Sequence, residues 1–452
     1  MILHGISMTS GAPWKHILRF AFPVLMGSLL QQLYNTADTV IVGNFSGEGA
    51  LAAVGTTGTF AFLFMAMAIG FSSGNGVVVA RYFGAGSGKL VRKNAVAGIV
   101  FLSVLGIISS VLGIVIAIPV FRHFVAVPEV ILDLAILYFR VYCLGLFFQF
   151  GYNILAGILR AVGDSASTLY FLIVSSVLNV LLDLLFVAVF HWGVVGAAVA
   201  TNIAQAVSFA AALWYMYRKY PIFRFKLSDF RSVCVADVGE TVRIGFPIAL
   251  QLMIVSCGLT LIQRAVNGFG QAMTASFTVG QRMEMYIHMP THAMHTTLAT
   301  FTGQNLGAGK IDRVKRGAMQ AVLISIVLTM MLALSVWLFH NEIIAFFGIG
   351  EAAAAYCRPH LRSLIVTSFI LTAYLPMFGL YQGAGHSGIP TVVAIAALSF
   401  RVCSTYLLRY SPFLGYSVIW WNGLFGFGAG FTVTWLYYFS NRWQKNAVMT
   451  VV

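Results

Sequence analysis

Long apolar stretches recur along the whole chain, and short polar or glycine-containing turns separate them. A helix needs about 20 consecutive apolar residues to cross the hydrocarbon core of a bilayer, and these stretches reach that length. The strands of a membrane β-barrel would instead alternate polar and apolar residues over segments of about ten. The pattern therefore predicts an all-α polytopic membrane protein with twelve spans, near residues 15–42, 51–80, 93–120, 130–160, 166–190, 193–217, 240–267, 272–304, 314–340, 352–383, 389–409 and 416–440.

The composition agrees with this pattern, because 59% of the residues are hydrophobic and only 9% are charged. Soluble globular domains are about 25% charged. We expect no cleavable signal peptide before the first span, which would then act as the insertion signal. The five cysteines show neither metal-site nor disulfide spacing, and we expect them to be inert: Cys143, Cys234, Cys257, Cys357 and Cys403.

The net charge of +14 comes from basic residues that gather in every second loop. Because cytoplasmic loops carry an excess of lysine and arginine, this distribution assigns a side to each loop. It predicts that the N-terminus, the polar stretch 218–239 and the C-terminus are cytoplasmic. We therefore expect a multi-pass protein of the plasma (inner) membrane of a bacterium, and no binding of nucleic acid.

Three motifs of the first half return in the second half, in the same order and at nearly constant spacing. The pairs are RFAFP (19–23) with RIGFP (243–247), RYFGAGSGKLVRK (81–93) with QNLGAGKIDRVKR (304–316), and GILRAVGDS (157–165) with GLYQGAGHS (379–387). The repeat predicts an N-terminal lobe with spans 1–6 and a C-terminal lobe with spans 7–12. The lobes would cover residues 1–217 and 240–452, joined by a cytoplasmic linker, residues 218–239.

Each predicted lobe contains an even number of spans, so both lobes begin and end on the same side of the membrane. Parallel repeats of this kind are related by an axis along the membrane normal, and a substrate cavity is expected between them. A transporter that alternates between two lobes needs this symmetry, whereas an enzyme or a receptor does not. The repeat therefore favours a transporter.

Three acids lie within predicted spans, namely Asp38, Asp183 and Glu284. Ionisable residues inside a membrane usually face the bundle interior or a watery cavity, and they indicate function. Asp38 lies about 8 Å before the outer end of span 1, and Asp183 about 12 Å before the outer end of span 5. Thr201 of span 6 lies about 12 Å deep as well, and Asn179 shares a helix face with Asp183.

These four side chains of the N-terminal lobe are expected to lie in one layer of the outer leaflet. Two carboxylates, an amide oxygen and a hydroxyl are hard oxygen ligands that suit a small cation. Two neighbouring buried carboxylates equally favour a proton held between them. The alternative is a hydrogen-bond network that only sets helix packing. The pattern favours an ion site, and it leaves the choice between Na⁺ and H⁺ open.

Taken together, several segments of the chain resemble the multidrug and toxic compound extrusion (MATE) family of cation-coupled exporters. The resemblance rests on residues 20–55, ILRAVGDS (158–165), NVLLDLLF (179–186), GAAVATNIAQ (196–205), VGQRMEM (279–285) and the two GAG loops, 81–95 and 302–316. It implies two six-helix lobes around a V-shaped cavity. It also implies export of hydrophobic or cationic drug-like compounds in exchange for Na⁺ or H⁺.

The resemblance also assigns roles to individual residues. It carries the cation site of the N-terminal lobe onto Asp38, Asn179, Asp183 and Thr201, so that a bound Na⁺ would lie among them. It makes Pro23 the point where span 1 bends, and Tyr34 and Tyr138 cavity-lining residues. Further cavity candidates are Gln31, Arg282, Glu284 and Met285.

Two features of the second half qualify these assignments. Spans 7 and 10 lack the acids that form a second cation site in some family members, so the sequence favours coupling through the N-terminal lobe. Arg282 and Glu284 are two residues apart and do not face each other on a helix. For this pair, a structural link between helices is favoured over a cavity role.

His288, His292 and His295 form one helical stripe in span 8. Their spacing could bind a metal, and the stripe could alternatively line the cavity. Because no fourth ligand is visible and methionines share the helix, core or interface histidines are favoured.

The sequence therefore predicts a secondary-active antiporter that is not an enzyme, uses no cofactor besides its coupling ion and works as a monomer. The GAG loops lack the spacing of a phosphate-binding loop, so nothing supports ATP-driven transport. Two alternatives remain. A lipid-linked oligosaccharide flippase of the same superfamily would be expected to carry an arginine-rich cavity, and an ion channel or sensor would not need two matched lobes.

Overall fold

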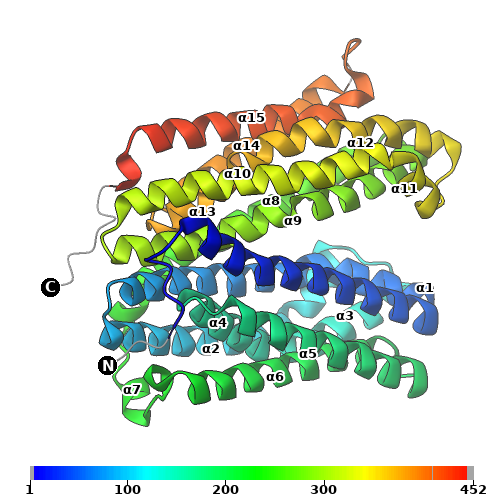
Figure 1. Ribbon diagram of the computed structural model, residues 1–452. Coiled ribbons are helices and arrows are strands. Elements are labelled where there is room, and N and C mark those ends of the chain that lie inside the picture. The colour runs from blue at the N-terminus through cyan, green and yellow to red at the C-terminus, as the bar shows by residue number, and fades with distance from the viewer. Residues whose placement is uncertain (1–4, 410, 445–452) are drawn as a thin grey trace. The chain divides into compact units, whose positions relative to one another are not determined.

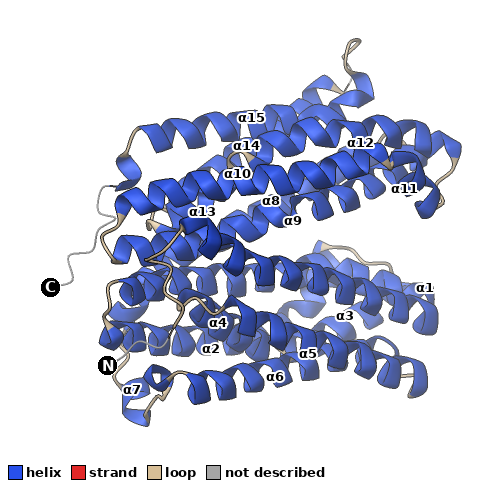
Figure 2. Ribbon diagram, in the orientation of Figure 1, coloured by secondary structure: helices blue, strands red, loops and turns tan. Residues whose placement is uncertain are grey.

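The computed structural model describes residues 5–409 and 411–444, and the regular structure of these residues is entirely helical (Figure 2). The chain begins with α1 (Pro13–Gly84), a helical segment of 72 residues. It contains the first two predicted spans, and Gly47 breaks it with φ 82° and ψ 176°. The all-α prediction is confirmed.

The rest of the first half contains spans 3–6. They are α2 (Gly88–Pro119), which continues as η1 (Val120–Phe124), α3 (Glu129–Leu144), α4 (Leu146–Ala161), α5 (Ser165–Asp183), which continues as η2 (Leu184–Val189), and α6 (Gly193–Lys219). The axes of α3 and α4 differ by 46°. Two short helices, η3 (Pro221–Phe223) and α7 (Leu227–Arg231), follow in the predicted linker.

The second half contains spans 7–12 and three short helices (Figure 1). The helices are α8 (Val235–Asn267), α9 (Gln271–Gly307), α10 (Ile311–Leu338), α11 (His340–Phe347), α12 (Glu351–Thr372), α13 (Leu375–Gly383), α14 (Gly388–Leu408), η4 (Gly415–Ser417), α15 (Val418–Phe439) and η5 (Arg442–Gln444).

Among the described residues, eight helices are long and apolar enough to cross a membrane, or nine if the bent pair α3–α4 is one span. This count takes α1 once, although α1 contains two segments on either side of Gly47. It omits α9 and α15, which are helical over the eighth and twelfth predicted spans. Every one of the twelve predicted spans is therefore helical.

The chain divides into two compact units. Of the described residues, the first unit comprises 5–7 and 22–250, and the second comprises 8–21, 251–409 and 411–444. Helix α1 therefore passes from one unit to the other just before Pro23, and α8 does so three residues after Pro247. The predicted lobe boundaries at 217 and 240 stay a prediction.

The internal repeat is visible in the backbone of the two halves. Matching turns carry glycines with positive φ: Gly47 and Gly270 (82° and 95°), Gly86 and Gly309 (74° and 72°), and Gly163 and Gly385 (90° and 77°). Residues with side chains rarely adopt these angles. The same turns thus recur at corresponding positions, which supports the parallel repeat predicted from the three motif pairs.

In the first unit, α1 and α8 approach each other backbone to backbone. A Cβ added to Gly74 would lie 2.5 Å from the Gly245 nitrogen, and one added to Gly70 would lie 2.4 Å from the Ala249 nitrogen. Small residues at helix interfaces are typical of membrane proteins, because close backbone approach maximises van der Waals contact.

Asp164 fixes the turn between α4 and α5. It caps α5 by accepting from the Ser167 amide at 3.1 Å, and it also accepts from Lys219 Nζ at 3.1 Å and Tyr220 Oη at 2.6 Å. Burial of Asp164 opposes ionisation, but these hydrogen bonds outweigh it and hold the pKa of its carboxyl below the ordinary value. The corresponding residue of the second half is His386, whose Nδ1 lies 3.3 Å from Tyr437 Oη.

Candidate functional site

The four predicted ion ligands come from three helices of the first unit. Asp38 is half-buried on α1, and Thr201 is half-buried on α6. Asn179 is 2% exposed on α5, and Asp183, the last residue of α5, is 0% exposed. Asn179 and Asp183 share a face of α5 because they are one turn apart.

The structure links these four side chains in two pairs. Asn179 Nδ2 lies 3.4 Å from Thr201 Oγ1, as donor to acceptor. The carboxyl groups of Asp38 and Asp183 lie near enough to interact electrostatically. Ionised carboxylates only accept hydrogen bonds. Such a pair is therefore stable only with a proton shared between its oxygens or with a cation beside them.

Several buried oxygens of this cluster lack a donor. Within the described part of the chain, no hydrogen-bond partner reaches Asp38 Oδ1, either carboxylate oxygen of Asp183, Asn179 Oδ1 or Ser176 Oγ. Buried polar atoms are nearly always satisfied, so each exception needs an explanation. Four of these five atoms are carboxylate or amide oxygens, which can bind a proton or a hard cation.

A cavity of about 10 Å³ adjoins the cluster. It has room for about one water molecule or a small ion. Its lining is mostly polar: Tyr34, Ser175, Ser176, Asn179, Thr201, Ala204 and Gln205. The sequence analysis missed Ser175, Ser176 and Gln205. They lie one turn from Asn179 or Thr201, so helical spacing from those two residues could have found them.

Aromatic residues surround the acid pair. Tyr34, one turn before Asp38 on α1, and Tyr138 of α3 both interact electrostatically with Asp38 and Asp183. Tyr142, which the sequence analysis did not select, stacks on Tyr138 with 6.4 Å between ring centroids. The predicted tyrosines thus lie beside the acids.

An apolar cluster packs next to the acid pair, toward the end of α5. Its buried members are Ile41, Val42, Ala50, Val187, Val194 and Ala197, with Tyr138 and Val180 packed against them. Ile41 and Val42 lie one turn after Asp38, and Val187 lies one turn after Asp183. Members of the apolar cluster therefore follow both acids by one helical turn.

The remaining cavity candidates lie elsewhere. Gln31 is exposed on α1, and Arg282 and Met285 are exposed on α9, in the second unit. Glu284 Oε1 lies 4.0 Å from His288 Nδ1, and His288 Nε2 lies 2.9 Å from Ser368 Oγ of α12. Glu284 therefore belongs to a polar link between α9 and α12.

The three histidines of α9 have different surroundings. His288 is buried against Ser368, His292 is exposed, and His295 Nε2 lies 2.9 Å from Gln382 Oε1 of α13. Two of them thus join α9 to neighbouring helices. The residues that the structure describes contain no group of three histidine, cysteine or acidic side chains arranged to hold a metal.

Helix α1 continues through Pro23, and Gly47 is the residue with non-helical angles inside it. Pro23 lacks the amide hydrogen that would bond to the Arg19 carbonyl, so the helix is weakened there. The bend predicted at this position stays a prediction.

A helical membrane protein of two repeated halves, with a buried pair of acids in one half, belongs to the class of transporters rather than enzymes. The family model described as MatE matches residues 23–185 and 247–407. The chain therefore belongs to the MATE family of multidrug efflux transporters. This membership confirms the resemblance drawn from the motifs.

Alignments with individual relatives cover nearly the whole of both chains. The chain is 27% identical to the "Probable multidrug resistance protein YpnP" of Bacillus subtilis, covering 99% of this chain and 100% of the relative. It is 24% identical to the "Probable multidrug resistance protein NorM" of Thermotoga maritima, covering 96% and 94%. A solved crystal structure of MATE in complex with MaL6 superposes with a TM-score of 0.92 at 25% identity, covering 98% and 99%.

Proposed function

We propose that this protein exports hydrophobic or cationic drug-like compounds from the cytoplasm in exchange for Na⁺ or H⁺. The description of its relatives as probable multidrug resistance proteins supports the substrate class. The acid pair Asp38 and Asp183 is the coupling site. The observation that carries this assignment is the pair itself, because its carboxyl groups lie near enough to interact electrostatically and buried oxygens of both lack a donor.

The chemistry of the pair accounts for coupling. Two ionised carboxylates repel each other in a poorly solvated site, and a proton or Na⁺ between them removes the repulsion. Asn179 and Thr201 supply further oxygens for Na⁺, whereas a proton needs only the two carboxylates. The ion then favours the conformation that holds these groups together. It shifts the equilibrium between this conformation and the other one by its difference in affinity for the two.

The substrate would approach the same region of the first unit. Tyr34 and Tyr138 interact electrostatically with both acids, and tyrosine rings attract organic cations through their π faces. A cationic compound beside these rings would benefit from ionised Asp38 and would lose this attraction once the ion arrives. Ion binding from outside would therefore favour release of the drug.

Membrane placement completes the proposal. The protein would lie in the plasma membrane of a bacterium as a monomer, with both termini in the cytoplasm. Basic residues at span ends, such as Lys89 and Arg92 at the start of α2, support this orientation, because lysine and arginine remain on the cytoplasmic side.

The test is dye efflux from proteoliposomes with an imposed Na⁺ or H⁺ gradient. Wild type should export a cationic dye under at least one gradient, and Asp38→Asn and Asp183→Asn should each reduce the gradient-driven rate at least about tenfold. Asp133→Asn, which changes an exposed acid of α3, is the matched control and should export normally.

Unimpaired gradient-driven efflux in both variants would contradict the coupling site. Wild-type protein that exports no cationic compound under either gradient would contradict the exporter itself.

A further inference from the structure

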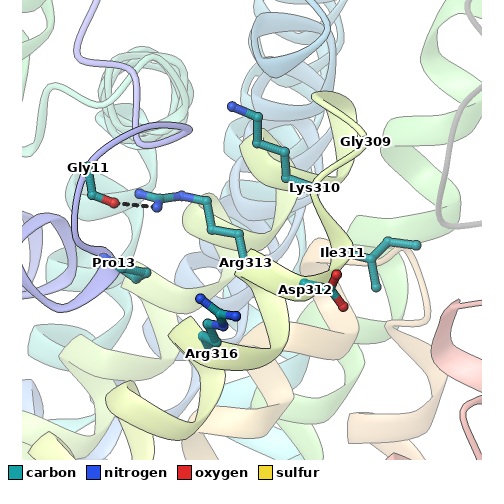
Figure 3. A pocket seen from close by; sticks show the side chains of 8 residues that line it. All are labelled: Gly11, Pro13, Gly309, Lys310, Ile311, Asp312, Arg313 and Arg316. Atoms are coloured by element: carbon teal, nitrogen blue, oxygen red, sulfur yellow. Dashed lines mark hydrogen bonds between the residues drawn. The ribbon is translucent and has the colours of Figure 1, made fainter.

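A basic pocket of about 500 Å³ lies where α9 meets α10, in the second unit (Figure 3). Three cations line it, Lys310, Arg313 and Arg316, against one acid, Asp312. The remaining lining residues are Gly11, Pro13, Gly309 and Ile311. We propose that this basic pocket binds the phosphate headgroup of an anionic phospholipid. The proposal goes beyond drug export, and it depends on membrane placement but not on the coupling site.

Arg313 builds one wall of the basic pocket. Its guanidinium donates to three main-chain oxygens of the segment before α1: Met8, Ser10 and Gly11. Figure 3 shows it turned toward Gly11, with the Asp312 carboxylate pointing elsewhere. Arg313 therefore holds the N-terminal segment in place, and its donors are already engaged by carbonyl groups.

Lys310 and Arg316 are the residues left to bind a ligand. Lys310 Nζ donates to the Thr9 carbonyl at 2.8 Å, which engages one of its three donor hydrogens. Arg316 is exposed and makes no hydrogen bond or ion pair with any other described residue. Its planar guanidinium matches the geometry of a phosphate and can donate two hydrogen bonds to it.

The depth of the basic pocket favours a lipid over a free phosphate. On α10, Leu323 is 62% exposed and lies seven residues after Arg316, or about 10 Å along the helix. Trp14, beside the lining residue Pro13, is 44% exposed, and tryptophan is enriched at the membrane interface. The cations thus lie at the level of headgroups, at the end of a helix surface suited to acyl chains.

The test is native mass spectrometry of the full-length protein titrated with dioleoylphosphatidylglycerol or dioleoylphosphatidylcholine. Wild type should bind phosphatidylglycerol at lower concentration than phosphatidylcholine. The double variant Lys310→Gln/Arg316→Gln should need about 25-fold more phosphatidylglycerol for half-saturation, about fivefold for each basic residue removed. Its binding of phosphatidylcholine should not change.

The matched control is Lys89→Gln/Lys315→Gln. It removes the same charge from the first turn of α2, in the first half, and from α10, and neither residue lines the basic pocket. This control should bind phosphatidylglycerol as wild type does. Equal loss of binding in both double variants would show that only net charge matters, and it would overturn the site. Unchanged binding in Lys310→Gln/Arg316→Gln would also overturn the site.

Competition with inorganic phosphate distinguishes a lipid headgroup from free phosphate as the bound anion. Millimolar sodium phosphate should not displace phosphatidylglycerol from wild type, because the acyl chains contribute to binding. Displacement would assign the basic pocket to a free phosphate and contradict the lipid. None of these measurements requires transport, so failure of the exporter proposal in the efflux assay leaves their outcome unaffected.

Discussion

At the scale of single residues, the neighbours of the acid pair distinguish a site for Na⁺ from a site for a proton. Asn179 and Thr201 offer an amide oxygen and a hydroxyl beside the carboxylates of Asp38 and Asp183. Na⁺ needs several oxygen ligands, whereas a proton between two carboxylates needs neither neighbour. Substitution at Thr201 therefore identifies the coupling ion.

Thr201→Val removes one oxygen and retains the shape of the side chain. If Na⁺ drives export, half-maximal activation should require about tenfold more Na⁺, since a hydrogen bond or ligand contact to a charge contributes about 1.5 kcal/mol or more. Export driven by H⁺ should not change. The measurement is efflux at graded Na⁺ and at graded pH, with Thr201→Ser as the control that retains the oxygen. An unchanged Na⁺ dependence would remove Thr201 from the ligand set.

Sequence reasoning selected the four candidate residues because helix geometry converts position along a span into depth. It found Asp38 and Asp183 because an acid is rare in an apolar stretch. It missed Ser175, Ser176 and Gln205, because serine and glutamine are not conspicuous in a helix without a known neighbour. The contacts of Arg313 with the N-terminal segment join residues about 300 positions apart, and no local pattern predicts such pairs.

At the scale of helices, the turn between α4 and α5 depends on one buried carboxylate. The folded-state pKa of Asp164 is depressed by its hydrogen bonds. Its ionised form therefore stabilises the fold above the unfolded pKa of about 3.9. This contribution is lost as the pH falls through the lower, folded-state value.

Asp164→Asn should consequently destabilise the protein by about 2 kcal/mol at neutral pH, because Lys219 and Tyr220 lose a charged acceptor. The difference from wild type should shrink as the pH is lowered below about 4. Thermal unfolding in detergent across this pH range measures both effects. A difference that stays constant with pH would show that the charge of Asp164 contributes nothing.

The contact between α1 and α8 gives a second prediction at this scale. Gly74→Ala should cost about 1–3 kcal/mol, because the new Cβ would lie 2.5 Å from backbone and could be accommodated only by moving a helix. Gly58→Ala, on the same helix, adds a Cβ with nothing within 4 Å and should be neutral or stabilising. Thermal unfolding compares the two, and equal stability of both variants would contradict this packing.

Helix lengths were easier to predict than helix junctions. The positions of the twelve predicted helical segments followed from the apolar runs of the sequence. The 46° bend between α3 and α4 did not, because no proline marks it and the junction at Gly145 depends on tertiary packing. A Cβ at Gly145 would lie 1.9 Å from Asn202 Oδ1, so this position accepts only glycine in the observed packing.

At the scale of the whole molecule, two helices carry the chain between the two compact units. Helix α1 does so just before Pro23 and α8 just after Pro247. Both prolines lack an amide hydrogen and interrupt the hydrogen-bond ladder of their helix. Repeated prolines at corresponding positions suit hinges that let each helix bend as transport proceeds.

Pro23→Ala restores a hydrogen bond within α1 and should stiffen this hinge. We expect an exporter that folds and binds dye, with gradient-driven efflux reduced about tenfold or more, since about 3 kcal/mol separates proline from alanine in a helix. Dye binding by fluorescence polarisation and efflux from proteoliposomes separate the two properties. Normal efflux by Pro23→Ala would argue against a hinge at this position.

Under the proposed mechanism, ion and drug compete through the acid pair. If the ion weakens drug binding, saturation with the ion changes the drug affinity by a fixed factor, typically 5–150-fold. The most direct test measures the dissociation constant of a fluorescent cationic substrate on purified protein, over a range of Na⁺ concentrations and of pH. In wild type, saturation with the coupling ion should weaken binding at least about fivefold. In Asp38→Asn/Asp183→Asn the affinity should not depend on the ion, whereas the same ion dependence in that variant would contradict the mechanism.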